Sequence, residues 1–595
     1  MSEPATTPEQ EANPGREAST ERAADPQRTA DAARQAILSG RTSLGIEFGS
    51  TRIKACLISD DDPSAVLGVG AHDWENQFVD RVWTYSLADV WSGLQSAYAE
   101  LLADAERRHG VRPTTFGALG VSAMMHGYLA FDASGELLVP FRTWRNTSTG
   151  PASAELTELF GLNIPLRWSI SHLHQAVLDA EPHIDRVHSI TTLAGYVHER
   201  LTGRHVIGIG DASGMFPIDS ATHDYDAELL SRYDALLAER GIALGEGSSL
   251  AALLPEVLVA GQPAGELTAE GAALLDPTGT LQPGIVLCPP EGDAGTGMVA
   301  TASVAPRTGN VSAGTSIFAM IVLERPLGSV HHELDLVTTP AGDAVAMVHC
   351  NNGASELAAW AGLFTRFAQA SATPGSGSAV DSDAVFDTLF REALLGEPDA
   401  GGLLAYNHLA GEPIAGLDEG RPLVVRTPDS RLTLANFMRA QLYGVFGTLA
   451  LGMRVLHDEG VAIDRMFAHG GLFRTAGVAQ RFLAGALDAP VSVAATASEG
   501  GAWGIAVLAS YVTATNAPSS PAASAPTLDG TSTAAHPIAP AASAPALDAY
   551  LRDRVFADAP FETSDPDPAD VAGFTSYLER YRAGLAVERA AAQHL

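Results

Sequence analysis

Asp293 lies in a glycine-rich segment whose residues suit phosphoryl transfer. The apolar run at residues 284–288 stops at two prolines, which predicts a buried strand that ends in a loop shortly before Asp293. Further along, Gly314, Thr315 and Ser316 follow a second strand-like run and offer backbone N–H groups and two hydroxyls to a phosphate. An acid and a phosphate cradle at adjacent strand ends predict phosphoryl transfer. For this segment alone, a solvated aspartate in a glycine-rich turn is an equally good interpretation.

A second candidate phosphate loop lies near the start of the chain. Residues 43–57 alternate apolar and polar side chains on both sides of Gly49-Ser50-Thr51, which predicts two strands joined by a tight turn. The turn would offer amides and hydroxyls to a phosphate, and Lys54 would add a positive charge. An ordinary β-hairpin with an exposed lysine explains the same spacing, and on spacing alone it is the better explanation.

Aromatic and polar residues that suit a sugar follow the strand expected at residues 116–122. His126 comes shortly after this strand, and Trp144 and Asn146 follow in an aromatic, polar stretch. Sugar sites combine an aromatic face with side chains that each hydrogen-bond one hydroxyl. Asp211, in a loop punctuated by glycines, is a further candidate for substrate binding. A satisfied core histidine at position 126 and a turn cap at position 211 are the structural alternatives, and taken alone both are the more common outcome.

The composition limits the classes of partner. At 595 residues the chain is long enough for more than one domain, and a hydrophobic content of 46% is ordinary for a soluble enzyme. The formal net charge of −34 argues against nucleic acid or an anionic membrane as a partner, because both need basic patches. An anionic substrate therefore needs a local lysine, metal ion or set of amides. Cys56, Cys288 and Cys350 lack the spacing of a metal site and predict buried thiols in a reducing compartment.

Two segments lack the composition of a folded domain. Residues 1–42 are predicted to form a disordered tail, in which residues 30–38 suit a short helix. Residues 516–545 are almost wholly Ala, Pro, Ser and Thr, which predicts a disordered insertion. Between them we expect a long amphipathic helix at residues 434–457 and a helix of small residues at residues 498–511. We expect neither a signal peptide nor a membrane-spanning segment, and therefore a cytoplasmic protein.

The order and spacing of four motifs resemble the FGGY family of carbohydrate kinases over about residues 44–511. The first phosphate loop of that family has the form G-I-D-x-G-T-x-x-x-K, and residues 45–54 have the sequence GIEFGSTRIK. Asp293 matches the block that carries the catalytic base of the family. Glu47 stands where the family usually has an aspartate near the metal, and the added methylene makes the metal geometry less certain.

The resemblance implies an α/β fold of two ribonuclease-H-like (actin-type ATPase) domains with an active-site cleft between them. The sugar-binding domain is expected at residues 43–303 and the nucleotide-binding domain at residues 304–595. ATP and Mg²⁺ are the expected cofactors, and Asp293 is expected to accept the proton of the attacking hydroxyl. The residues assigned by resemblance to ATP are Gly49, Ser50, Thr51, Lys54, Gly314, Thr315, Ser316, Gly470, Gly471 and Thr475, and those assigned to the metal are Glu47 and Asp293.

The sugar side of the motif set resembles xylulokinases at Met125-His126-Gly127, but Trp144-Arg-Asn-Thr147 replaces their W-x-D-x-R. Asn146 therefore stands in place of a carboxylate, which weakens the case for D-xylulose. We expect a ketopentose kinase that acts on L-ribulose, with D-xylulose as the alternative and a non-catalytic sugar- or nucleotide-binding protein as a less favoured one. The expected partners are the sugar and ATP, and a homodimer stays open. The substrate-binding residues expected from the resemblance are Met125, His126, Trp144, Asn146 and Asp211.

Overall fold

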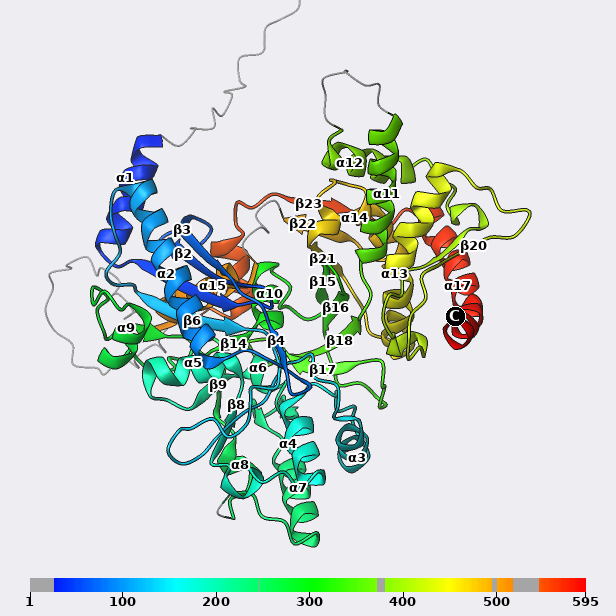
Figure 1. Ribbon diagram of the computed structural model, residues 1–595. Coiled ribbons are helices and arrows are strands. Elements are labelled where there is room, and N and C mark those ends of the chain that lie inside the picture. Colours follow the sequence, from blue (N-terminus) through cyan, green and yellow to red (C-terminus); the bar gives the residue numbers. More distant parts are fainter. Residues whose placement is uncertain (1–25, 246, 372–379, 495–499, 517–544) are drawn as a thin grey trace, which may run out of the picture.

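Two lobes, each built around one mixed β-sheet, make up the computed structural model, which describes residues 26–245, 247–371, 380–494, 500–516 and 545–595 (Figure 1). In the first sheet the order is β13-β6-β1-β2-β3, and β14 also pairs with β6. Strands β1, β2 and β3 are antiparallel, whereas β6 and β13 run parallel to β1. The bounds are β1 Thr42–Phe48, β2 Arg52–Ser59, β3 Val66–Asp73, β6 Ala118–Ala123, β13 Val286–Leu287 and β14 Glu291–Gly292.

The second sheet repeats this topology. Its order is β17-β18-β16-β15-β21-β22-β23, so that β18-β16-β15-β21-β22 corresponds strand for strand to β3-β2-β1-β6-β13. The repeat gives the expected two-domain, actin-type architecture. The bounds are β15 Thr308–Ala313, β16 Ile317–Val322, β17 Asp335–Thr338, β18 Ala344–Cys350, β21 Arg465–His469, β22 Val491–Ala494 and β23 Phe561–Ser564.

Helices cover both sheets, and local sequence signals set their ends. Ser86 caps α2 by accepting a hydrogen bond from the backbone N–H of Asp89, and Gly110 ends it in a left-handed conformation. Thr433 caps α13 in the same way, at the start of the helix expected from residue 434. In Figure 1, α3, α4, α7 and α8 form a region below the first sheet. The helices are α2 Leu87–His109, α3 Gly150–Phe160, α4 Ser169–Leu178, α7 Ala227–Glu239, α8 Leu250–Leu253, α11 Ser355–Ser371, α12 Ser382–Ala393, α13 Leu434–Asp458, α14 Ala479–Leu487 and α17 Pro568–His594.

Helix α15 (Gly500–Asn516), which the domain assignment from sequence placed with the second lobe, packs on β1 and β6 of the first (Figure 1). A Cβ at Gly45 on β1 would lie 2.1 Å from the Ala502 carbonyl oxygen, so the helix and the strand meet backbone to backbone. Tyr550 and Phe556 stay on this helix after the chain returns, with ring centres 5.1 and 5.5 Å from Tyr511 and Trp503. Small residues therefore let α15, although it follows the second sheet in sequence, dock on the sheet of the first lobe.

Part of the N-terminal tail expected at residues 1–42 is a helix in the structure. Helix α1 (Pro26–Leu38) places Ala36 and Ile37 in the core beside the first sheet. Arg34 fixes the helix further by donating from Nη1 to the carbonyl oxygens of residues 109 and 110, at 3.0 Å each. The rest of that tail, and residues 517–544 of the expected insertion, lie outside the described residues.

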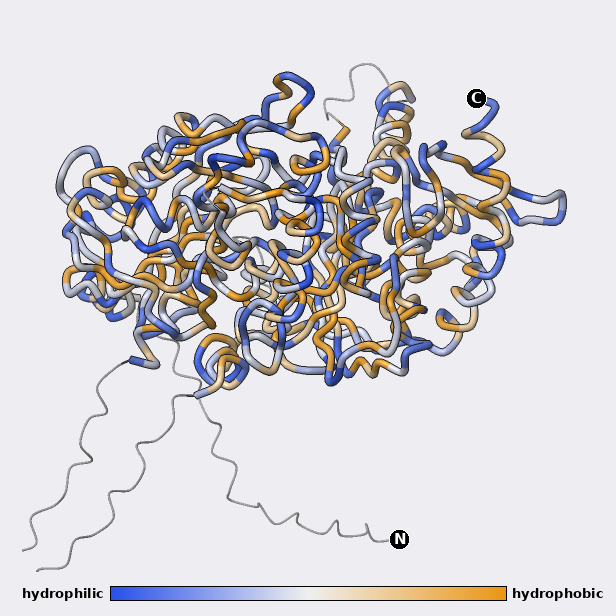
Figure 2. Tube along the Cα trace, turned by 90° about the horizontal axis from the view of Figure 1, so that it is seen from below, coloured by the Kyte–Doolittle hydropathy of each residue, from blue (hydrophilic) through white to orange (hydrophobic). Residues whose placement is uncertain are grey.

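Hydrophobic segments are spread through the whole body and do not gather into one continuous stretch (Figure 2). Within the described ranges, no helix combines the length and the apolar character needed to cross a membrane. The three cysteines are buried and none of them forms a disulfide, as their apolar surroundings predict.

Candidate active site

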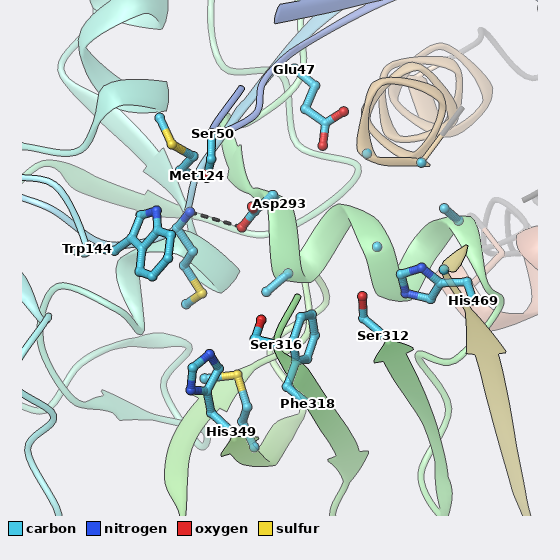
Figure 3. Close-up of a pocket in the computed structure, with 18 of the residues that line it drawn as sticks. Glu47, Ser50, Met124, Trp144, Asp293, Ser312, Ser316, Phe318, His349 and His469 are labelled. Carbon is cyan, nitrogen blue, oxygen red and sulfur yellow. Dashed lines mark hydrogen bonds between the residues drawn. The ribbon is translucent and has the colours of Figure 1, made fainter. Parts of the chain in front are cut away.

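A cavity of about 470 Å³ is lined by residues from both lobes, with Asp293 at its centre (Figure 3). Asp293 is the first residue of α10 (Asp293–Ala300), where the positive end of the helix dipole favours a carboxylate. Its Oδ1 accepts a hydrogen bond of 3.0 Å from the backbone N–H of Met125, which comes from the end of β6. Burial raises the pKa of Asp293 above its ordinary value, which makes the carboxylate a stronger base.

Glu47 and Lys54, on paired strands of the first sheet, face the same cavity as Asp293. Lys54 Nζ lies 3.6 Å from Glu47 Oε2, and this oxygen is buried without a hydrogen-bond partner. Burial raises the pKa of Glu47; Lys54 partly offsets this rise and the charge of Asp293 adds to it. Two carboxylates with an unsatisfied oxygen fit Mg²⁺, which binds one or two protein carboxylates together with substrate phosphates. In keeping with this, the described residues contain no cluster of three or more His, Cys, Asp or Glu that would hold a metal alone.

The two predicted phosphate loops lie in the hairpins β1–β2 and β15–β16. Ser50 and Ser316 line the cavity. Gly49 closes the first turn by donating to the Arg52 carbonyl at 3.0 Å. The structure places the other predicted loop residues at the rim: Thr51, Gly314 and Thr315 are exposed and do not line the cavity.

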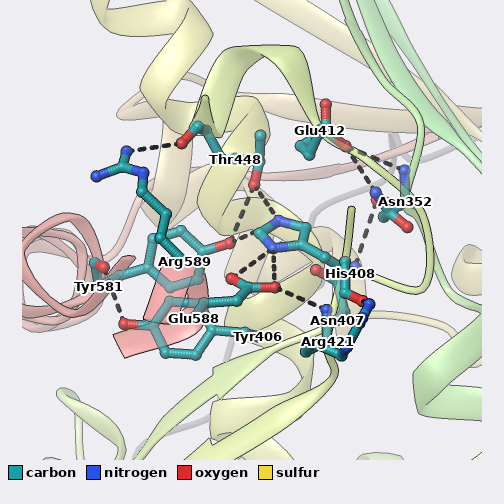
Figure 4. Close-up of polar contacts among 12 residues, drawn as sticks. Asn352, Tyr406, Asn407, His408, Glu412, Arg421, Thr448, Tyr581, Glu588 and Arg589 are labelled. Atoms are coloured by element: carbon teal, nitrogen blue, oxygen red, sulfur yellow. Dashed lines mark hydrogen bonds and ion pairs between the residues drawn. The ribbon is translucent and has the colours of Figure 1, made fainter. Parts of the chain in front are cut away.

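A network of buried polar side chains supports the second loop (Figure 4). Gly353 donates to the Thr315 carbonyl at 2.7 Å, and Asn407 Nδ2 donates in turn to the Gly353 carbonyl at 2.7 Å. Next to Asn407, His408 pairs with Glu588 of α17, with 2.8 Å between Nδ1 and Oε2. Two consecutive residues, Asn407 and His408, therefore link the second phosphate loop to the C-terminal helix.

The glycine turn after β21 joins two cavities. Gly470 lines the catalytic cavity, whereas Gly471 and Thr475 line a second cavity of about 500 Å³, shared with α11 and α12. Gly470 has a φ of 105°, and a Cβ there would lie 2.3 Å from the Ala313 carbonyl oxygen, so only glycine fits the turn. Gln480, which follows this turn in the sequence, donates to the backbone carbonyls of residues 491 and 562.

Met125, His126 and Trp144, three of the predicted sugar ligands, line the cavity. His126 is buried with a φ of 73°, which is uncommon outside glycine and asparagine. Burial, with Arg167 second, lowers its pKa well below the ordinary value, so the imidazole is neutral at pH 7. A neutral imidazole both donates and accepts hydrogen bonds, which suits a sugar hydroxyl.

Two predicted sugar ligands do not line the cavity. The side chain of Asn146 is engaged with the backbone: Oδ1 accepts from the Trp83 N–H at 2.9 Å, and Nδ2 donates to the carbonyls of Trp83 and Thr143 at 2.8 and 3.0 Å. Asp211 is buried in α6 (Ile209–Ala212), where Oδ2 accepts from the Thr192 hydroxyl at 2.6 Å. Both side chains were predicted to contact the sugar. In the structure they instead form hydrogen bonds with other parts of the protein.

Asp211 belongs to a buried acidic pair behind Asp293. Burial raises the pKa of Asp211 to about 7, and the pKa of Glu291 to about 8 with a further contribution from Asp211. Glu291 accepts from the backbone N–H groups of Gly210 and Asp211 at 3.3 and 3.0 Å. This pair connects α6 to the strand that precedes Asp293, so it positions the candidate base without reaching the cavity.

Sequence reasoning missed several residues that line the cavity. Arg167 pairs with Asp335 of the second lobe, and Asn163 Nδ2 donates to the same carboxylate at 3.1 Å. His349 lies near the end of β18, and its position at a strand end was a usable signal, whereas Arg167 follows no periodic pattern. The other missed residues that line the cavity include Met124, Thr301, Ser312, Phe318, Met347, His469 and Trp503.

Comparison with known families decides the identity of the fold. Residues 42–281 match the N-terminal domain model of the FGGY family of carbohydrate kinases, and residues 309–513 match the C-terminal domain model. The chain belongs to the FGGY family. The two matched segments contain Glu47, Lys54, Ser316 and Gly470, so the loops that meet at the cavity come from both family domains.

Individual FGGY proteins resemble this chain over part of its length in sequence and over most of it in structure. The xylulose kinase of Escherichia coli (strain K12) is 27% identical over 233 residues, which cover 36% of this chain and 44% of that protein. The xylulose kinase of Streptomyces coelicolor is 28% identical over 249 residues, covering 39% and 47%. The matched segment thus spans less than half of each of these relatives. The solved structure of xylulose kinase from Rhodospirillum rubrum superposes with a TM-score of 0.69 at 20% identity, over 92% of this chain and 99% of that one, and supports the fold alone.

Proposed function

We propose that this protein is an ATP-dependent sugar kinase that phosphorylates a hydroxyl of a ketopentose. The observation that carries the proposal is that Asp293 shares one cavity with candidate phosphate-binding and candidate sugar-binding groups. The candidate phosphate-binding residues that line it are Ser50, Lys54 and Ser316. His126 and Trp144 line the same cavity and offer a neutral imidazole and an aromatic face that suit a polyol.

In this arrangement Asp293 accepts the proton of the sugar hydroxyl as the oxygen attacks the γ-phosphorus. Its raised pKa strengthens it as a base, and the N–H of Met125 fixes its orientation. Lys54 and the amide-rich turns stabilise negative charge on the transferred group, and holding the two reactants in line supplies a large part of the rate. Mg²⁺, held by Glu47 and Asp293 when it is bound, supplies further neutralisation of the phosphate charge.

The nucleotide would extend from the catalytic cavity over the Gly470–Gly471 turn. Its phosphates would face Ser316 and Gly470, and its adenosine would enter the cavity lined by Gly471 and Thr475. Because no side chain projects from either glycine, the backbone N–H groups of this turn are open to a ligand.

For the acceptor we propose D-xylulose, with L-ribulose as the alternative. The expectation of L-ribulose rested largely on Asn146, which stands in place of a carboxylate. Because the Asn146 amide is bound to the Trp83 backbone and does not line the cavity, it is no argument against D-xylulose. The two xylulose kinases that resemble the chain in sequence also favour D-xylulose.

The test is ADP release with ATP and Mg²⁺ against D-xylulose, L-ribulose, other ketoses and glycerol. We expect D-xylulose to be turned over with the highest kcat/KM among the pentuloses and glycerol, and Asp293→Asn to lower kcat by at least about 100-fold, the usual contribution of a general base. Asp418→Asn, at an exposed position outside the cavity, is the matched control. Thermal stabilisation by a sugar with no ADP release from any acceptor would instead identify a binding protein.

A further inference from the structure

A further cavity of about 460 Å³ adjoins the sugar side of the active site; we refer to it as the outer cavity. Trp144, Arg167 and His349 line both the outer and the catalytic cavity. None of the phosphate-loop residues and neither catalytic carboxylate lines the outer cavity. A sugar whose hydroxyl faces Asp293 would therefore point its other end past Trp144 and His349, towards the outer cavity.

The lining of the outer cavity has the chemistry of a carbohydrate subsite. Trp83 and Trp144 both line it, and the Arg145 guanidinium lies 5.5 Å from the Trp83 ring centre and 5.3 Å from that of Trp144. Arg145 itself lines the outer cavity, and within the described ranges it forms no ion pair with a carboxylate. Indole faces pack on the C–H faces of sugars, and a guanidinium donates to their hydroxyls.

This platform is held in place before any ligand arrives. Asn146 binds both backbone groups of Trp83, and Phe78 packs on the Trp83 ring with 4.7 Å between ring centres. Fixing an aromatic side chain in advance reduces the entropy that binding would otherwise cost. The amide at position 146 therefore supports the outer cavity, although it does not touch the catalytic one.

We propose that the outer cavity is a second acceptor subsite, through which the active site also takes a polyhydroxylated chain longer than a pentulose and binds it more tightly than D-xylulose. The end of the chain beyond the fifth carbon packs on Trp83 and Trp144 and accepts hydrogen bonds from Arg145. This inference rests on the proposed kinase function and deepens it, because it assigns the length of the acceptor to a set of residues outside the catalytic cavity.

The experiment compares D-xylulose with the seven-carbon ketose sedoheptulose, which has the same configuration at the third and fourth carbons. In the wild type we expect kcat/KM to be at least about tenfold higher for the longer ketose, through a lower KM. Trp83→Ala and, separately, Arg145→Ala should lower the ratio of the two kcat/KM values about tenfold. Arg426→Ala, at an exposed position away from both cavities, should leave the ratio unchanged.

The outcomes separate this inference from the proposed function. Equal losses for both ketoses in the two variants, or a wild type that gains nothing from the longer chain, would overturn the second subsite and leave the kinase proposal standing. If neither ketose yields ADP, the affinity for each ketose is measured by quenching of tryptophan fluorescence. Tighter binding of the longer ketose that is lost in Arg145→Ala would support the second subsite without the kinase function. Equal affinity for the two ketoses would refute the second subsite. Arg145→Ala also covers the case in which Trp83→Ala fails to fold.

Discussion

Gly353 is the residue on which the second phosphate loop rests, so Gly353→Ala is a direct test of that loop. Gly353 N–H donates to the Thr315 carbonyl, and the next residue donates to the Gly314 carbonyl at 2.8 Å. A Cβ at position 353 would lie 2.5 Å from the Gly314 oxygen and 2.7 Å from the carbonyl carbon and oxygen of Ser316. All three atoms are backbone, so no flexible side chain can move aside.

The size of the effect follows from that geometry. Ordinary contact begins at 3.4 Å, so the loop must retreat by about 0.9 Å from the 2.5 Å position. Misplacing a group in an active site by about 1 Å costs up to roughly 100-fold in rate, which corresponds to about 2.7 kcal/mol. We therefore expect kcat/KM for ATP to fall about 100-fold, while the sugar side, which Gly353 does not touch, keeps its affinity.

The assay is ADP release at saturating sugar with ATP varied, together with sugar binding measured by thermal shift. Gly150→Ala is the matched control, because a Cβ at position 150 would meet no heavy atom within 4 Å. Wild-type ATP kinetics in a folded Gly353→Ala variant would refute the assignment of residues 314–316 to phosphate binding. Loss of sugar affinity equal to the loss for ATP would show that the substitution disturbs the whole cleft.

Three further variants test neighbouring parts of the argument. Glu47→Gln should raise the Mg²⁺ concentration that gives half-maximal activity about tenfold, which corresponds to about 1.4 kcal/mol. The measurement is a Mg²⁺ titration at fixed ATP. An unchanged midpoint of this titration would show that Glu47 does not bind the metal. Asn407→Ala should raise KM for ATP about tenfold without changing KM for the sugar, since its amide holds Gly353; equal changes in both would indicate general destabilisation. Asp211 has a pKa of about 7 in the fold against an ordinary 3.8, so the folded state retains its proton and the wild type loses stability as pH rises between these values. The melting temperature of Asp211→Asn relative to wild type should therefore rise from pH 4 to pH 7, and a constant difference would contradict the raised pKa.

The parts of the site that the sequence predicted are those encoded locally. Asp293 follows a strand that two prolines end, and each phosphate loop is a short turn between strands of one hairpin. In such cases the alternation of the strands predicts the position of the turn, and the types of the turn residues indicate which ligand the turn could bind. The loop residues at the cavity, Ser50 and Ser316, were therefore found together with Lys54.

The parts that the sequence missed depend on contacts between distant segments. Asn146 has the residue type and position of a sugar ligand, and only the placement of Trp83 shows that its amide is already engaged. Arg167 reaches the cavity because Asp335, far along the chain, holds it there. Helix α15 packs on the first lobe although the segments before it in sequence belong to the second. Gly45 allows this packing because it has no side chain between the strand and the helix. None of these pairings follows from local periodicity.

The repeated topology brings one candidate phosphate loop from each lobe to the same cavity. The loops at Ser50 and Ser316 follow corresponding strands, β1 and β15, and helices α10 and α15 follow the corresponding fifth-strand regions and pack against each other. A Cβ at Gly504 would lie 2.2 Å from the Thr296 carbonyl oxygen, so these helices meet almost without side chains. Yet the repeat is unequal in charge, because the corresponding start of α10 carries Asp293 whereas that of α15 carries glycine. In the proposed reaction a base is needed only where the sugar hydroxyl reacts, and a glycine at the other helix leaves space for the nucleotide. The difference between Asp293 and this glycine therefore agrees with a proposal in which the acceptor reacts beside α10 and a phosphate loop of each lobe faces the nucleotide.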